Sequence, residues 1–173
     1  MTLEVRTFSL ALEEREDGDG RTLSGLLVPY DTEAQIGSYV ETFRRGSFTD
    51  ADPTKVPLLA QHGRDELPIG RATTLTDTDV GLQAEFRVSK TAAGDDVLQL
   101  VRDGAVRGLS VGFVPIENRW NEQRTRVDRL RARLVEASVT AFPAYDGAQI
   151  VAVRAVLPPS PARTPRLSLA RRR

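Results

Sequence analysis

The chain has 173 residues, enough for one domain with a hydrophobic core and too few for two full domains. Its 24 basic and 24 acidic residues balance, so no net charge draws it to nucleic acid or to an anionic membrane. It lacks cysteine, which excludes thiol nucleophiles and disulfide frameworks, and it has no apolar run of the roughly 20 residues that span a bilayer. We therefore expect an intracellular protein that binds neither nucleic acid nor membrane.

Alternating apolar residues in the first half of the chain predict a sheet that is mainly antiparallel. Residues 3–12 form one predicted strand, residues 13–20 an acidic turn and residues 23–30 a second strand, and together they predict a hairpin. The segment 41–48 mixes two aromatic residues with a glycine, and we predict irregular structure there. Further strands are predicted at residues 56–62, 69–76 and 80–89.

A change of periodicity after residue 90 predicts a helix. Val97, Leu98, Val101 and Ala105 recur at helical spacing, and two aspartates lie in the first turn, where they suit the helix dipole. We expect this helix to end near Gly104.

The second half of the chain predicts two more strands and a tail. Residues 106–116 form the first strand, and the six arginines of residues 117–133 predict a solvated hairpin or a mobile loop. Residues 134–142 alternate again, with Glu136 on the polar face. Residues 157–173 contain four prolines, five arginines and no acid, so we predict one domain over residues 1–156 followed by a disordered tail.

Nucleophilic chemistry in this chain would depend on a serine and on His62, the only histidine. A serine hydroxyl needs an adjacent general base near neutral pH. Ser110 is the candidate, because Gly108 and Gly112 flank it on a predicted strand and leave its hydroxyl open to approach. The same spacing matches the nucleophile elbow of α/β-hydrolases, but no helix follows and no histidine comes later, which excludes that fold.

A third group commonly holds the imidazole of such a pair in the right tautomer. Glu136 is the preferred candidate, because it is a lone acid in an otherwise apolar strand, and Asp65 and Glu66 are alternatives that follow His62 closely. Backbone amides near the serine are the expected oxyanion donors, with Arg107 as a candidate helper. Ordinary structural roles remain open too: the glycines can mark a bulge, the histidine can bond a backbone carbonyl, and the glutamate can lie at the surface.

Residues 22–153 resemble the prohead maturation proteases of tailed bacteriophages with the HK97-type capsid, a family similar to the herpesvirus assembly proteases. The order and spacing of several short segments carry the resemblance: Gly25-Leu26-Leu27-Val28-Pro29-Tyr30, Leu58-Leu59-Ala60-Gln61-His62, Gly108-Leu109-Ser110-Val111-Gly112-Phe113 and Leu134-Val135-Glu136-Ala137-Ser138-Val139. The resemblance implies that His62 is the base, Ser110 the nucleophile and Glu136 the orienting acid.

The resemblance also implies an α+β fold, a small and mainly antiparallel β-barrel with flanking helices as in the herpesvirus proteases. The implied activity is that of a serine endopeptidase without metal or organic cofactor. Its substrates would be the scaffolding segment of the major capsid protein, any scaffolding protein and the protease itself, all cleaved inside the immature capsid in the host cytoplasm. The relatives of the assembly-protease type imply a homo-oligomer, with a dimer as one form.

Two functions of other classes stay open. A catalytically inactive scaffolding or capsid-binding module predicts that His62 and Ser110 lie too far apart to form a hydrogen bond. A small-molecule esterase or amidase predicts a deep apolar pocket beside Ser110.

Overall fold

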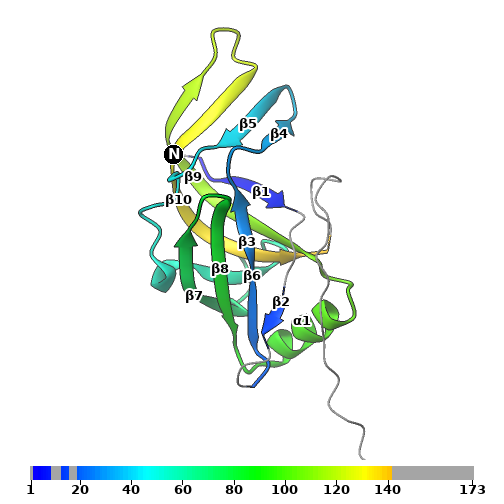
Figure 1. Cartoon of the computed structure of the whole chain (residues 1–173). Helices are drawn as coiled ribbons and strands as arrows, with labels where there is room; N and C mark the ends of the chain where they lie inside the picture. The colour runs from blue at the N-terminus through cyan, green and yellow to red at the C-terminus, as the bar shows by residue number, and fades with distance from the viewer. Residues whose placement is uncertain (1, 9–12, 16–18, 142–173) are drawn as a thin grey trace, which may run out of the picture.

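The computed structural model describes residues 2–8, 13–15 and 19–141, and these form a curled half-barrel sheet with one α-helix (Figure 1). The strands are β1 (Glu4–Phe8), β2 (Glu13–Arg15), β3 (Thr22–Pro29), β4 (Glu33–Ile36), β5 (Tyr39–Phe43), β6 (Pro57–Ala60), β7 (Gly70–Asp77), β8 (Gly81–Val88), β9 (Gly108–Trp120) and β10 (Arg126–Thr140). The helix α1 (Ala92–Arg102) follows β8, and a short 3-10 helix, η1 (Pro53–Lys55), precedes β6. The predicted tail, residues 157–173, lies outside the described residues.

The strands follow the order β1-β9-β10-β6-β7-β8-β3-β2, and β5 pairs with β10 and with β4. The pairs along this path are antiparallel, except that β10 runs parallel to β6 and to β5. β10 therefore has partners on both edges. The β4–β5 pair and the tip of the β9–β10 hairpin project together from one end of the molecule, and α1 lies near the other end (Figure 1).

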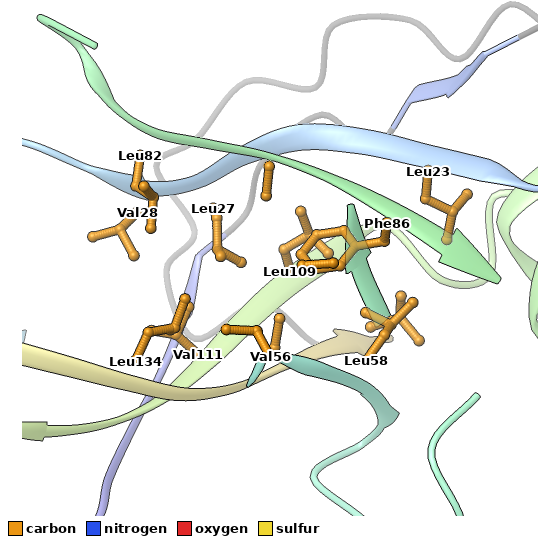
Figure 2. Close-up of a cluster of buried hydrophobic side chains, with 14 of the residues drawn as sticks. Leu23, Leu27, Val28, Val56, Leu58, Leu82, Phe86, Leu109, Val111 and Leu134 are labelled. Atoms are coloured by element: carbon orange, nitrogen blue, oxygen red, sulfur yellow. The ribbon is translucent and has the colours of Figure 1, made fainter. Parts of the chain in front are cut away.

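The hydrophobic core fills the inside of the curl. Figure 2 shows side chains of β3 and β8, among them Leu27 and Phe86, facing side chains of β6, β9 and β10, among them Leu58 and Val111. These four side chains are fully buried. Burying a leucine or phenylalanine side chain contributes about 1.5–3 kcal/mol, so this core is the main source of stability. It holds β6, β9 and β10 in fixed relation to one another.

Helix α1 and the β7–β8 hairpin confirm the sequence prediction for residues 69–104. Thr91 caps the helix and accepts a hydrogen bond from the backbone N–H of Gly94 at 3.2 Å. Val97, Leu98 and Val101 form its buried face, as their spacing predicts. None of the helices within the described ranges has the length and hydrophobicity of a membrane crossing.

The prediction for the N-terminal hairpin is wrong. β1 pairs with β9, at the far side of the sheet, whereas β3 pairs with β2 on one edge and with β8 on the other. Residues 13–15, predicted to lie in a turn, form the strand β2. Alternation predicts that a segment is extended, but it carries no information on which edge the strand joins.

Three further predictions need correction. Residues 41–48 were predicted to be irregular, yet their first part belongs to strand β5. The strand predicted to end at residue 116 continues as β9 to Trp120, and Pro115 is tolerated within it because the proline lies beyond the pairing with β1 and beside a register shift of β10. Residues 117–133 form the outer part of the β9–β10 hairpin, which confirms the predicted hairpin, but Arg129 within them is buried and not solvated.

A buried ion cluster joins β1 to β5 and β10. The carboxylate of Glu41 is 1% exposed and accepts hydrogen bonds from the guanidinium groups of Arg6 and Arg129. Glu4 bonds the same two arginines, at 2.5 and 2.7 Å. Both guanidinium groups also lie over the ring of Phe113, at 5.5 and 5.7 Å from its centre. Two positive charges thus compensate the buried carboxylate.

Replacing Glu41 by glutamine should destabilise the protein strongly, because it leaves two buried arginines with a single compensating carboxylate, Glu4. We expect the free energy of unfolding to fall by about 3 kcal/mol or more, measured by urea denaturation. Glu33→Gln is the matched control, since Glu33 pairs with Arg126 at the surface and its loss should cost less than about 1 kcal/mol. Equal losses in the two variants would contradict the structural importance of the cluster.

Candidate active site

Three neighbouring strands bring the three predicted site residues together. Ser110 lies on β9, Glu136 lies on the adjacent strand β10, and His62 follows the end of β6, which pairs with the other edge of β10. In the antiparallel register Ser138 faces Ser110 and Glu136 faces Gly112, so these side chains share one face of the sheet. The imidazole of His62 approaches this face from the β6 side.

A tight turn directs His62 toward the sheet. Gln61 and His62 have φ angles of 51° and 59°, and the N–H of Gly63 donates to the carbonyl oxygen of Ala60 at 2.9 Å. Positive φ at both central residues is the mark of a type I′ turn, which costs residues other than glycine conformational energy. The turn is anchored where the N–H of Gln61 donates to the carbonyl of Val139 at 3.0 Å. The turn, not strand alternation, therefore sets the direction of His62.

The three side chains form a continuous hydrogen-bonded chain. Ser110 Oγ is 2.7 Å from His62 Nε2, and His62 Nδ1 is 2.7 Å from Glu136 Oε1. Because a carboxylate can only accept, Nδ1 carries the proton and Nε2 is left as the acceptor for the serine hydroxyl. The imidazole is 23% exposed, whereas Ser110 is fully buried and Glu136 is 2% exposed. The separation that an inactive module predicts is not found.

Local irregularity and a second serine hold Glu136 in place. A register shift after Leu134 leaves Val135 as an extra residue in β10, and this bulge aims Glu136 across Gly112. The second carboxylate oxygen, Oε2, accepts a hydrogen bond from Ser138 Oγ at 2.7 Å, and Ser138 Oγ in turn accepts from the backbone N–H of His62 at 3.3 Å. Ser138 therefore links the acid to the turn that carries the histidine.

Sequence reasoning missed Ser138 and the groups that cover Ser110. Thr7 Oγ1 lies 2.8 Å from Ser110 Oγ, and the carbonyl oxygen of Arg6 lies 2.9 Å from it. Both groups belong to β1, more than 100 positions away in the chain. Ser138 was visible as a polar residue two positions after Glu136, on the same face of a strand. The contacts from β1 had no local signal, because they depend on strand order.

The other candidates lie elsewhere. Asp65 and Glu66 are exposed, and the carboxylate that contacts His62 Nδ1 is that of Glu136. Arg107 is exposed just before β9, and its backbone N–H donates to the carbonyl of Thr140 at 3.3 Å. Its role as an oxyanion helper stays a prediction. A hollow at the projecting end of the molecule is lined by Trp120 and its neighbours and includes none of the three site residues.

The site has the groups for acyl transfer by a serine nucleophile. His62 Nε2 is placed to take the hydroxyl proton of Ser110, and Glu136 is placed to stabilise the imidazolium that results. Within the described ranges, no group of three or more histidine, aspartate and glutamate side chains is arranged to hold a metal ion.

Comparison with known proteins gives relatives in sequence and in structure. The family model described as "Caudovirus prohead serine protease" matches residues 8–158. The prohead protease of Enterobacteria phage HK97 is 30% identical over 116 residues, which cover 64% of this chain and 52% of that protein. The capsid polyprotein of Pseudomonas phage PAJU2 is 29% identical over 108 residues, 58% of this chain and 16% of that protein. The chain thus spans about half the length of the first relative and less of the second.

A solved structure supports the fold. The structure of the bacteriophage T4 capsid assembly protease aligns with a TM-score of 0.57, covering 79% of this chain and 96% of that one. Sequence identity in this alignment is 10%, so the likeness concerns the course of the backbone.

Gly112→Ala should separate Glu136 from His62 while the sheet stays folded. A Cβ at position 112 would clash with the carboxylate of Glu136, so this side chain must move. The backbone pairing of residue 112 with β10 does not depend on its side chain and should remain. Because the chain has one histidine, its Nδ1–H proton resonance can be followed by NMR without ambiguity. We expect the low-field resonance of a histidine bonded to a carboxylate in the wild type and its loss in the variant.

Gly37→Ala is the control for this experiment, because position 37 lies in the turn between β4 and β5, away from the site, and an added Cβ meets no atom within 4 Å there. Its positive φ of 54° means that alanine strains the backbone at this turn without touching the site. An unchanged imidazole resonance in Gly112→Ala would contradict the assigned contact between Glu136 and His62.

Proposed function

Because this chain belongs to the caudovirus prohead serine protease family, we propose that it is a serine endopeptidase that cleaves the scaffolding segment of the major capsid protein, and itself, during capsid maturation. The observation that carries the proposal is the hydrogen-bonded chain from Ser110 through His62 to Glu136. Its two 2.7 Å contacts have the geometry that a serine nucleophile and its base require.

In the proposed reaction Ser110 Oγ attacks the carbonyl carbon of a substrate peptide bond while His62 Nε2 accepts the hydroxyl proton. The tetrahedral intermediate collapses, the C–N bond breaks, and His62 returns the proton to the leaving amine. A water molecule, activated by His62 in the same way, then releases the acyl group from Ser110. Glu136 keeps the imidazole in the reactive tautomer and compensates its positive charge during both steps.

The oxyanion of each intermediate needs donors that are already in place. We assign this role to backbone amides near Ser110, with Arg107 as a candidate helper. The main-chain N–H of Arg107 is engaged with Thr140, so any help from this residue would come from its exposed guanidinium group.

The names of the relatives support a capsid substrate. One relative is a prohead protease, and another is a capsid polyprotein. On this basis we assign the chain's action to the interior of the immature capsid in the host cytoplasm, with capsid and scaffolding segments as its partners. We further propose a homo-oligomer, such as a dimer, as its working form.

The proposal extends to the finer architecture. We propose that the half-barrel sheet is the small barrel of the herpesvirus assembly proteases, that residues 1–156 form the protease domain, and that residues 157–173 are a disordered tail. The curled sheet with its mainly antiparallel pairings is the observation that supports the first of these assignments.

Co-expression with the major capsid protein of the same phage tests the activity. Mass spectrometry of the intact products should show a shortened capsid protein with the wild type and a full-length one with Ser110→Ala, because removal of the nucleophile costs on the order of 10⁶ in turnover. Full-length capsid protein in both samples would contradict the protease assignment and favour the scaffolding module. The folded state of the variant is checked by its urea unfolding curve.

Ser138→Ala should reduce the rate of capsid protein cleavage by about tenfold, which corresponds to the loss of one hydrogen bond to a charged group at the lower end of its range. The substitution removes the hydrogen bond to Glu136 Oε2 and the acceptor for the His62 N–H. Ser138→Thr keeps the hydroxyl and should recover much of the rate, whereas a loss of the same size in both variants would point to packing alone. We expect the fall to be in kcat and the KM to stay near that of the wild type.

A further inference from the structure

The chain covers its own nucleophile. Ser110 has no solvent-accessible surface, although its base His62 is 23% exposed. The cover is β1, which pairs with β9 in antiparallel register so that Thr7 lies opposite Ser110. A substrate carbonyl cannot reach Ser110 Oγ while β1 stays in this position.

β1 also competes for the proton and the lone pairs of the nucleophile. The hydroxyl of Ser110 has one proton, and besides His62 Nε2 at 2.7 Å the carbonyl oxygen of Arg6 at 2.9 Å is an acceptor within its reach. When Ser110 donates to Arg6, it does not donate to its base. The hydroxyl of Thr7, 2.8 Å away, can in addition donate to the oxygen that would attack. β1 therefore gives the Ser110 hydroxyl hydrogen-bond partners that compete with its base.

A specific contact latches β1 in place. Arg6 inserts its guanidinium between Glu41 of β5 and the ring of Phe113, and its side chain is 9% exposed. Burial alone would lower the pKa of Arg6, but the hydrogen bond to Glu41 and the nearby acidic groups outweigh it and raise the pKa further. The latch stays charged at any physiological pH.

β1 can leave without breaking another strand pairing, and it then takes Glu4 and Arg6 out of the ion cluster while Glu41 stays bonded to Arg129. It occupies one end of the strand order and has one neighbour there, β9. β9 keeps its other partner, β10, along its whole length. Opening of a terminal strand of five residues requires no other pairing to break.

We infer that β1 is a self-bound inhibitory strand, held by the contact between Arg6 and Glu41, and that an extended segment of the substrate must replace it on the edge of β9 before Ser110 can react. This inference rests on the proposed function, since it concerns the regulation of the same site. The incoming segment recovers the backbone hydrogen bonds that β1 gives up, as strand addition at a sheet edge does. Its scissile carbonyl then takes the place beside Ser110 Oγ that the Arg6 carbonyl occupies.

The reactivity of Ser110 in the full-length chain tests whether β1 is an inhibitory strand. A fluorophosphonate reagent forms a bond between phosphorus and an activated serine Oγ and releases fluoride, while the hydroxyl proton goes to the base. Arg6→Ala breaks the latch but leaves Glu41 paired with Arg129. We expect labelling of Ser110 to be about tenfold to a hundredfold faster in this variant than in the wild type, the range in which loss of a charged hydrogen bond shifts an opening equilibrium.

Two variants serve as controls. Arg131→Ala removes the same side chain from an exposed pair with Asp50 and should label at the wild-type rate. Ser110→Ala should take up no reagent. A synthetic peptide with the sequence of residues 2–8 should slow the labelling of Arg6→Ala, and a peptide of the same composition in scrambled order should not.

Hydrogen exchange of the segment Glu4–Phe8, read by mass spectrometry on the same samples, separates the outcomes. Faster exchange together with faster labelling in Arg6→Ala supports the inference. Equal labelling of wild type and Arg6→Ala overturns the inhibitory role of β1 and leaves the protease assignment intact. Faster exchange with no labelling of any variant shows that β1 opens onto an unreactive serine, which overturns the proposed function itself.

Discussion

The burial of carboxylates inside the half-barrel is the constraint on which the rest of the structure depends. Glu41 and Glu136 are almost completely buried, and a buried carboxylate is tolerated only where donors compensate its charge and its lone pairs. Each recruits its donors from distant parts of the chain. Glu41 binds arginines from β1 and β10, and Glu136 binds the turn after β6 and its own neighbour Ser138. Glu41 thus holds β1, β5 and β10 together, and Glu136 orients His62 in the site.

Strand β10 connects these two regions. Its antiparallel pairing with β9 sets Ser138 opposite Ser110, and its parallel pairing with β6 sets Val139 beside Ala60. A shift of one residue in either register would turn the polar face of β10 toward the core and remove the site. The bulge at Val135 and the strained turn at His62 are local departures from regular geometry, and both lie where they aim a functional side chain.

Local patterns predicted the elements whose stability is local. The helix from Ala92 and the β7–β8 hairpin were predicted nearly to their ends, because cap, periodicity and turn lie within a few residues of one another. The pairing partner of the first strand was predicted wrongly, because its partner β9 lies about a hundred positions later in the chain. The alternation within β1 is compatible with any sheet edge. Alternation correctly predicted which residues of β10 share its polar face. It could not predict that this face is buried.

By itself, the sequence determined which groups are available for chemistry: one histidine, no cysteine, a serine between two glycines and a lone acid in an apolar strand. With a single imidazole in the chain, the identity of any histidine base needed no structure. Only the tertiary structure decided that His62 lies 2.7 Å from both the Ser110 hydroxyl and the Glu136 carboxylate. It also decided that Ser138 bonds Glu136 and that β1 covers Ser110. The physical reason is that strand order and register follow from the burial of the whole core, a sum over residues far apart in the chain that no local pattern contains.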